Sequence, residues 1–315
     1  MQLQANQHPR LQRSYLSNRI MQIIFLVCAV LLVIVIVGVF VFVGVNAFRV
    51  FNERGGTTFQ NFFFNTTWDP IGALGNPSFG AAGLIIGSVV ITLLSVIIAT
   101  PLAFGMALFF TELSPLWLTR LLQPLIEIFT GMPSVVIGFL GLVVLVPFLS
   151  RIFGPLQGGI QTAGYGWGSG TLVLIIMILP TIISISIDTL RAVPSSVREA
   201  SLALGSTRWQ MMSRAIIPAA STGLATAVVL GMARAIGETL AVSLVLGGQE
   251  IPKKLFTPLI FFQPNVNITQ IIALEFGDAY GPARDAYWTL GFVLLLISFL
   301  FVCVSRYLAS RSVYK

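Results

Sequence analysis

Six long apolar runs, separated by polar intervals, dominate the chain. They fall at residues 20–45, 82–111, 123–148, 170–190, 219–247 and 286–308. Each run is as long as the roughly 20 residues that an α-helix needs to cross the hydrocarbon core of a bilayer. The first is too long for the core of a signal peptide, and no small-residue cleavage site follows it. The pattern predicts an all-α, polytopic membrane protein with six transmembrane helices.

Composition agrees with this prediction. Of the 315 residues, 56% are hydrophobic and only 9% are charged, whereas soluble domains carry roughly 25% charged residues. No polar stretch is long enough to build a separate soluble core, and none forms a basic, aromatic-rich module that would bind nucleic acid. We therefore expect membrane lipid around the chain and no nucleic acid as a partner. Cys28 and Cys303 both lie in apolar runs, so no disulfide is implied.

The distribution of positive charge predicts the orientation of the spans. With the N-terminus inside, the inner intervals hold Arg10, Arg13, Arg19, Arg120, Arg191, Arg198, Arg208, Arg214, Arg306, Arg311 and Lys315. The outer intervals hold Arg49, Arg54, Arg151, Lys253, Lys254 and Arg284. This is 11 positive residues against 6, so the positive-inside rule places both termini and residues 191–218 in the cytoplasm. Residues 1–19 and 309–315 are then cytoplasmic tails, and we expect the first to be disordered.

The outer connections differ in character. Residues 46–81 and 248–285 are long and polar, and we expect them to form a structured external surface. Residues 149–169 are rich in glycine and are expected to form a flexible loop. Trp68, Trp117, Trp167 and Trp288 lie at or outside the ends of the predicted spans, which is typical of an aromatic belt at the membrane interface.

Prolines lie inside three predicted spans, at Pro101, Pro133 and Pro180. A proline removes a backbone donor and permits a kink, which fits either an ordinary bend or a helix that rocks beside a pathway. Residues 131–141 combine Pro133 with three glycines and Ser134. Small residues let helices approach closely. This stretch is a candidate for close packing and for pathway lining, with Ser134 as its polar group.

The fifth span contains two charges near the predicted mid-membrane, Arg234 and Glu238. Each costs about 2.5–3.5 kcal/mol there on insertion scales. A spacing of four residues places both on one helix face, where they can pair. A self-neutralising structural pair and a functional site are both possible. Function is favoured because arginine precedes glutamate, the weaker order for a helical pair, and because apolar residues would pack at lower cost. Gly231, Gly237 and Thr239 keep the surroundings small and polar.

The side chain of Arg234 suits an oxyanion. A guanidinium donates parallel hydrogen bonds to two oxygens and stays charged when it is desolvated. Glu238 would tune this contact, either by accepting a hydrogen bond from a protonated oxyanion or by neutralising Arg234 when the path is empty. Carboxylates near span ends, such as Glu112, are expected to be interfacial instead.

Enzyme signatures are missing from the sequence. The chain has no G-x-x-x-x-G-K-[ST] phosphate loop. Its one histidine, His8, lies in the tail, which excludes histidine-centred triads and metal clusters. We therefore expect no catalysis, no metal and no cofactor bound by this chain.

A polar, helix-prone segment at residues 191–218 separates the fourth and fifth runs. Residues 196–199 and 207–210 both fit the capping-box pattern, and Gly205 lies between them as a turn. Two short amphipathic helices parallel to the membrane face are predicted. Such an element is suited to binding by a soluble partner.

This segment resembles the EAA loop of ABC-importer permeases, whose pattern is Glu-Ala-Ala, three residues, Gly, nine residues and Ile-x-Leu-Pro. The residues that match at the right intervals are Glu199, Ala200, Gly205 and Pro218, while Ser201, Ala215 and Ile217 depart from it conservatively. The resemblance implies the type I ABC importer (MetI-like) permease fold over residues 82–308, with one extra N-terminal span at 20–45. It also implies that the four matching residues couple the chain to an ATPase.

Other stretches resemble the phosphate importer permeases, and the PstC type more than the PstA type. They are residues 234–242 (RAIGETLAV), 111–115 (TELSP) and 132–142 (MPSVVIGFLGL). The resemblance implies that Arg234, Glu238, Thr239 and Ser134 line the path of phosphate.

It further implies three partners: a second permease subunit of the PstA type, a dimer of PstB-type ATPase subunits that carries the ATP and Mg, and an extracytoplasmic PstS-type phosphate-binding protein. The expected location is a bacterial or archaeal plasma membrane. The alternatives are a permease for sulfate, molybdate or another tetrahedral oxyanion, an ATP-independent anion channel or carrier, and a membrane scaffold.

Overall fold

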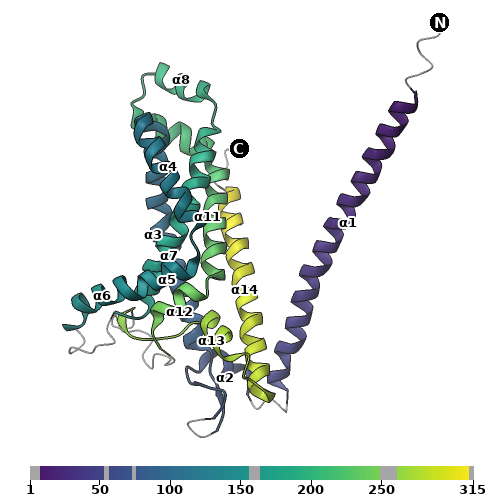
Figure 1. Ribbon diagram of the computed structural model, residues 1–315, viewed down its shortest axis with the longest axis vertical. Helices are drawn as coiled ribbons and strands as arrows, with labels where there is room; N and C mark the ends of the chain where they lie inside the picture. Colours follow the sequence, from purple (N-terminus) through teal and green to yellow (C-terminus); the bar gives the residue numbers. More distant parts are fainter. Residues whose placement is uncertain (1–7, 53–56, 73–75, 156–163, 249–260, 312–315) are drawn as a thin grey trace.

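The computed structural model describes residues 8–52, 57–72, 76–155, 164–248 and 261–311, and within these ranges the protein is a helical bundle (Figure 1). The exception is a short antiparallel hairpin of β1 (Trp68–Asp69) and β2 (Ser78–Phe79), in which Trp68 pairs with Phe79. Helices that are long and apolar enough to cross a membrane number five in the described chain, or six if one bent pair is counted as a span. The prediction of an all-α, polytopic membrane protein is confirmed.

Four of the predicted spans are single long helices. These are α1 (His8–Ala47), α3 (Ala82–Leu108), α7 (Trp167–Arg191) and α14 (Gly281–Arg311). The helix α3 packs against α7 more extensively than any other described pair. Fully buried alanines, Ala99, Ala103 and Ala107, lie in the hydrophobic core that α3 shares with α7 and α11 (Ser221–Gly237). Small side chains let these helix backbones approach closely.

The third predicted span, residues 123–148, is not one helix. The chain forms α4 (Leu116–Gly131), then α5 (Ser134–Leu140), a π-helical turn η3 (Gly141–Leu145) and α6 (Val146–Phe153). Met132 is extended (φ −67°, ψ 135°), the conformation that a residue before proline prefers. By contrast, α3 and α7 continue through Pro101 and Pro180. Of the three prolines, only Pro133 separates two helices.

The fifth predicted span, residues 219–247, is also broken. The helix α11 ends at Gly237, and α12 (Leu240–Leu246) begins three residues later. Glycine and threonine are poor helix formers. At the other end of α11, the axis bends by 72° where the segment Arg208–Ala219 meets Ser221. The expectation of one continuous helix over this range was wrong.

The N-terminal segment is more ordered than predicted. Residues 1–19 were expected to be disordered, but α1 begins at His8 and runs for 40 residues. Pro9 lies in the first turn, where proline is tolerated. From there to Gly38 the sequence contains neither glycine nor proline. Once the apolar span is helical, each further residue adds to an existing nucleus, so extension costs little.

The helix α1 leans away from the bundle and joins it near the start of α14 (Figure 1). Thr289 donates its hydroxyl to the Ala47 carbonyl at 2.7 Å, and Phe42 stands edge-on to Trp288 with ring centroids 5.5 Å apart. Most side chains between Ser17 and Val45 are exposed in this chain. This apolar surface therefore has lipid or another chain as its neighbour.

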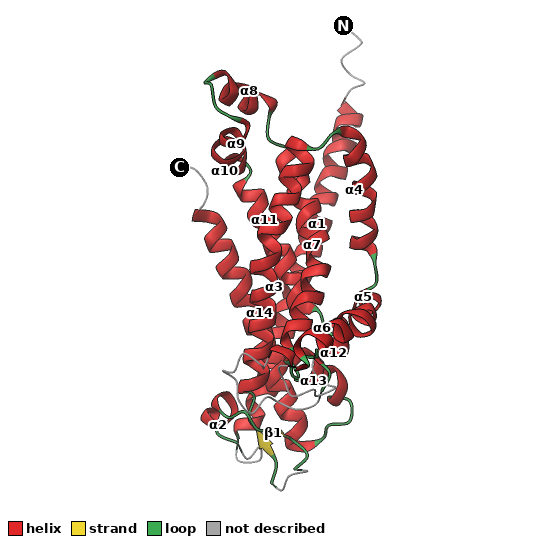
Figure 2. Cartoon of the chain, turned by 90° about the vertical axis from the view of Figure 1, so that its left-hand side faces the viewer, coloured by secondary structure: helices red, strands yellow, loops and turns green. Residues whose placement is uncertain are grey.

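The two long polar connections pack together, as expected of a structured surface. They contribute η1 (Phe48–Phe51), α2 (Phe59–Phe64), the β1–β2 hairpin and α13 (Ile268–Glu275). Phe62, Ile268 and Tyr287 are buried in one hydrophobic cluster shared by these elements and α14. The cluster lies at the end of the bundle opposite α8 (Ser195–Ala203), while the first turns of α1 and the end of α14 lie at the α8 end (Figures 1 and 2). Lys253, Lys254 and Arg54 fall outside the described residues.

Trp167 was wrongly assigned to an interfacial belt. It is the first residue of α7 and is only 2% exposed. Gly87 of α3 admits the indole, because a Cβ there would lie 2.9 Å from the ring nitrogen. The glycine-rich connection before it falls partly outside the described residues, but Gly164 and Gly166 are described and adopt positive φ angles of 105° and 123°.

Close packing between α5 and α12 depends on Gly138. A Cβ at this position would lie 2.5 Å from Ala241 Cα and 2.8 Å from its carbonyl oxygen, both backbone atoms. We expect Gly138→Ala to destabilise the protein by about 1–3 kcal/mol, the usual cost of overpacking, and to lower the midpoint of thermal unfolding in detergent. Gly105→Ala in α3 is the matched control, since its Cβ would meet no described atom within 4 Å. An unchanged midpoint of thermal unfolding for Gly138→Ala would contradict the close packing of α5 against α12.

Candidate functional site

The segment at residues 191–218, here called the EAA segment, forms a helical hairpin beyond the bundle (Figure 2). Its first helix is α8, and its second arm consists of α9 (Arg208–Met211), a π-helical turn η5 (Met212–Ile216) and α10 (Ile217–Ala219). Gly205 adopts φ +79° and turns the chain between the arms. The Gly205 amide donates to the Leu202 carbonyl at 2.9 Å, and the Ser206 amide donates to the Ser201 carbonyl at 3.4 Å. These two hydrogen bonds form a Schellman motif at the end of α8.

One of the two predicted capping boxes forms. The Thr207 hydroxyl accepts from the Gln210 amide at 3.3 Å, and the Gln210 side chain accepts from the Thr207 amide at 2.9 Å. The box predicted at Ser196 does not form, because α8 already begins at Ser195 with Pro194 as its N-cap. Ser196 therefore lies within the first turn and not at the cap. The predicted pair of short helices is nevertheless present.

The EAA segment presents an exposed surface with apolar side chains. Leu204 is 89% exposed and Trp209 67% exposed, and in the described structure α8 has no buried residue. Glu199, Ala200 and Gly205 are also exposed, while Pro218 is half-buried at the start of the bend into α11. An exposed leucine and an exposed tryptophan on a polar helical hairpin are typical of a surface that another protein covers.

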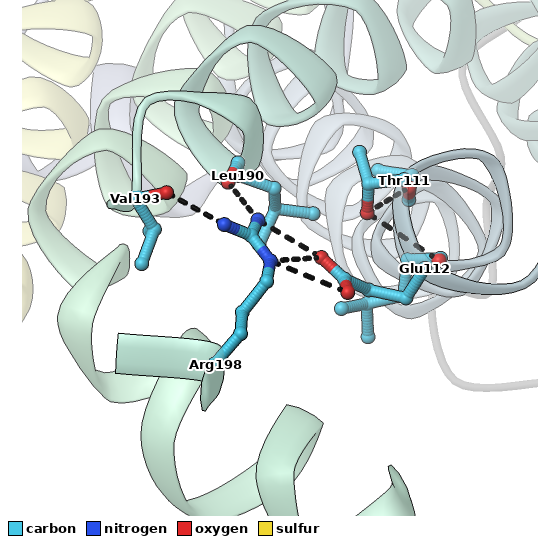
Figure 3. A network of polar contacts seen from close by, with 7 residues as sticks. Thr111, Glu112, Leu190, Val193 and Arg198 are labelled. Atoms are coloured by element: carbon cyan, nitrogen blue, oxygen red, sulfur yellow. Dashed lines mark hydrogen bonds and ion pairs between the residues drawn. The ribbon is translucent and has the colours of Figure 1, made fainter. Parts of the chain in front are cut away.

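The hairpin is tied to the bundle by Arg198, which sequence reasoning did not single out. Its guanidinium forms an ion pair with Glu112 at 3.0 Å and donates to the carbonyls of Leu190 and Val193 (Figure 3). Glu112 lies at the end of the apolar segment Ala82–Leu113, as predicted, and its side chain, which faces Arg198, is only 8% exposed. The two residues are 86 positions apart, and nothing local in the sequence predicts such a contact.

Arg234 lies in α11 and points toward α7, where it donates to the Thr181 hydroxyl at 2.9 Å. The ion pair predicted with Glu238 does not form. The cause is the end of α11 at Gly237: Glu238 is extended (φ −78°, ψ 123°), so the four-residue helical spacing no longer applies. Arg234 is half-buried, with a neutral hydroxyl as its described hydrogen-bond partner.

Glu238 instead stabilises the break between α11 and α12. Its carboxylate accepts from the Ala241 amide at 3.2 Å, one of the free donors at the start of α12. Its carbonyl accepts from the Thr269 hydroxyl at 3.4 Å. Both bonds satisfy backbone groups that the broken helix leaves without partners, as the membrane interior requires.

A small polar cavity lies beside this break. Its polar lining consists of Ser88, Thr92, Glu238, Asn267 and Thr269, and apolar side chains of α3, α7, α11, α12 and α14 complete it. The volume is about 20 Å³, which is room for about one water molecule. A polyatomic ion does not fit, so the cavity is closed to such a solute in this state.

The other two predicted pathway residues, Thr239 and Ser134, lie on different elements. Thr239 is half-buried within the break, and its hydroxyl donates to the Gly237 carbonyl at 3.5 Å. Ser134 is half-buried at the first position of α5, the helix that packs against α12 through Gly138. Neither residue lines the small cavity. Thr92, Asn267 and Thr269 do line it, and no sequence motif had singled them out.

Solved structures with this fold belong to ABC transporters. A chain of a bacterial alginate ABC transporter in complex with an alginate-bound periplasmic protein superposes with a TM-score of 0.62 at 15% identity, over 96% of this chain and 98% of that one. A chain of the MetNI methionine ABC transporter, in an inward-facing conformation, gives 0.54 at 17% identity over 73% and 94%. The fold is therefore that of the membrane chains of this class.

The chain belongs to the family described as binding-protein-dependent transport system inner membrane component, whose model matches residues 99–314. It is 42% identical to a probable ABC transporter permease, YqgH of Bacillus subtilis, over 90% of this chain and 88% of that protein. It is 34% identical to the phosphate transport system permease PstC of Pasteurella multocida over 80% of both, and 35% identical to PstC of Mesorhizobium japonicum over 80% and 78%. The chain is thus a non-catalytic, multi-pass inner-membrane permease that works with an ATPase and a substrate-binding protein.

Proposed function

We propose that the chain is the transmembrane permease subunit of an ATP-driven phosphate importer. The likeness to PstC permeases along most of both chains carries the proposal. A half-buried arginine within a membrane helix, held only by a neutral hydroxyl among its described hydrogen bonds, supports an anion as the transported species. No described carboxylate forms an ion pair with this guanidinium. A tetrahedral oxyanion supplies a negative charge together with matching acceptors.

The orientation follows from the same proposal. The EAA segment, the start of α1 and the end of α14 lie at one end of the molecule (Figure 1), and this end faces the cytoplasm. Residues 46–81 and 248–285 then face outward, where a PstS-type binding protein delivers phosphate. The excess of positive residues in the inner intervals supports this orientation.

ATP and Mg are bound by a dimer of PstB-type ATPase subunits and not by this chain. The ATPase receives the EAA segment through Glu199, Ala200 and Gly205, whose exposure leaves them free for contact. Pro218 lies at the 72° bend into α11, so movement of the segment is passed to the helix that carries Arg234.

A second permease subunit of the PstA type completes the pathway. The bare apolar surface of α1 supports such a partner, since one chain alone leaves it uncovered (Figure 1). Phosphate passes Arg234, and Glu238, Thr239 and Ser134 contribute polar contacts. The cavity beside Glu238 is closed at about 20 Å³, so passage requires movement at the α11–α12 break.

Uptake by the reconstituted complex tests the substrate. We expect proteoliposomes with both permeases, the ATPase and the binding protein to accumulate radiolabelled phosphate only when ATP is present, and to exclude sulfate. Preferential uptake of sulfate or molybdate would instead show that the complex transports another tetrahedral oxyanion. Phosphate movement through this chain alone, without ATPase, would instead identify a channel or carrier.

Replacement of Arg234 tests its place in the pathway. Arg234→Leu removes charge-assisted hydrogen bonds worth about 1.5–3 kcal/mol, so the initial rate of uptake should fall roughly 10- to 150-fold. The complex should still assemble, because leucine suits a membrane helix. Arg120→Leu, which removes an exposed arginine of α4, is the matched control and should transport normally. Undiminished uptake by Arg234→Leu would remove this arginine from the mechanism.

Two substitutions in the EAA segment test the ATPase contact. Gly205→Asp places a side chain at φ +79°, which strains the turn, and Glu199→Lys reverses an exposed charge. We expect both to abolish co-purification of the ATPase without lowering the yield of the permease. Gly277→Asp is the control, as Gly277 is exposed at the opposite end, and its Cβ would meet no described atom within 4 Å. Normal ATPase assembly in both variants would contradict the assignment.

A further inference from the structure

The two arms of the EAA segment are attached to the bundle by different means. The second arm is packed into the main hydrophobic core through Met211, Met212 and Ile216, which are at most 5% exposed. The first arm, α8, has no buried residue in the described structure, and only Val197 packs partly against the core. Its polar attachment is Arg198, whose side chain is 23% exposed.

Arg198 reaches two other helices at once (Figure 3). Its Nε donates to the two carboxylate oxygens of Glu112 at 3.1 and 3.4 Å, and its Nη2 donates to one of them at 3.0 Å. Its Nη1 donates to the Val193 carbonyl at 2.6 Å, and Nη2 also to the Leu190 carbonyl at 2.9 Å. These carbonyls lie at the C-terminal end of α7, where a positive charge is favourable.

Glu112 is held in place by an unusual turn. It lies in the π-helical turn η2 (Phe109–Leu113) that ends α3, and the Ser114 amide closes this turn onto the Phe109 carbonyl at 2.7 Å. The Thr111 hydroxyl bonds back to the Ala107 carbonyl at 3.0 Å. A π-turn inserts an extra residue into a helix and is frequent at functional sites. Here the carboxylate is nearly buried and faces α8.

We propose that Arg198 is a positioning residue that fixes α8 to the cytoplasmic ends of α3 and α7, so that a displacement of α8 moves both spans together. This inference rests on the proposed function, because it takes the partner ATPase to be what moves α8. Lysine would replace arginine only in part here. An ammonium is a point charge, whereas the planar fork bonds a carboxylate on one side and two carbonyls on the other.

The ratio of phosphate taken up to ATP hydrolysed, measured in proteoliposomes of the full complex, tests the proposal. We expect Arg198→Ala to keep the ATPase bound and hydrolysing while this ratio falls at least 10-fold. Arg198→Lys and Glu112→Gln, which each keep part of the bonding, should give intermediate ratios. Arg191→Ala is the matched control, since Arg191 is exposed on the last turn of α7 with one long bond of 3.4 Å to Gln123. An unchanged ratio in Arg198→Ala would overturn the proposal.

A second measurement does not depend on the substrate. Spin labels are placed at Ala203→Cys on α8 and Leu113→Cys at the end of α3, after both native cysteines are replaced by serine. The distance between the labels should stay narrow and unchanged on ATP binding with Arg198 present, and should broaden or lengthen in Arg198→Ala. Equal distributions in the two proteins would refute the link. If every Arg198 variant loses the ATPase, Arg198 contributes to ATPase binding, and this result would also refute the proposed link.

The two proposals fail in different ways. If the unaltered complex takes up no phosphate, the proposed substrate is wrong, while the label distances still report whether Arg198 links the helices. If phosphate uptake is normal and the label distances do not respond to Arg198→Ala, the proposed transport function is supported and the linking role of Arg198 is refuted.

Discussion

The requirement that every backbone polar group find a partner in the membrane interior governs this structure. Helices satisfy it internally, so a break in a span is stable only where nearby protein supplies the missing bonds. The break at Gly237–Thr239 meets this condition through the Glu238 carboxylate, which caps Ala241, and through Thr269, which bonds the Glu238 carbonyl. One side of the break lies beside α13 and α3, and the small polar cavity is found there.

The same break separates the two charges of the fifth span. In a continuous helix Arg234 and Glu238 would neutralise each other, and an anion would then compete with a carboxylate for the guanidinium. Since Glu238 is occupied by the start of α12, Arg234 keeps a single described partner, the uncharged hydroxyl of Thr181. A hydroxyl is displaced at far lower cost than a carboxylate. The broken helix thus leaves Arg234 without a carboxylate partner among the described residues, as the proposed contact with an anion requires.

Hydropathy predicted a polytopic helical chain and the approximate bounds of the four spans that are single helices, because a bilayer fixes the length of an apolar helix. It did not predict the breaks. Pro101, Pro133 and Pro180 look alike in sequence, yet only Pro133 separates two helices, whereas α3 and α7 continue through their prolines and pack against each other. The capping pattern at Thr207 was informative because both its partners are local. The pair Arg198–Glu112 joins residues 86 positions apart, and no local pattern contains that information.

The two attachments of the EAA segment differ in a way that bears on coupling. Hydrophobic packing is non-directional, so the arm of Met211, Met212 and Ile216 tolerates small rotations against the core while it stays continuous with α11. A bidentate ion pair with two added carbonyl bonds is directional, so α8 cannot rotate about Arg198 without losing bonds to a nearly buried carboxylate. A force on the hairpin therefore reaches α11 through the chain itself and reaches α3 and α7 through one side chain. In the proposed mechanism, both arms of the EAA segment therefore move the spans that surround Arg234.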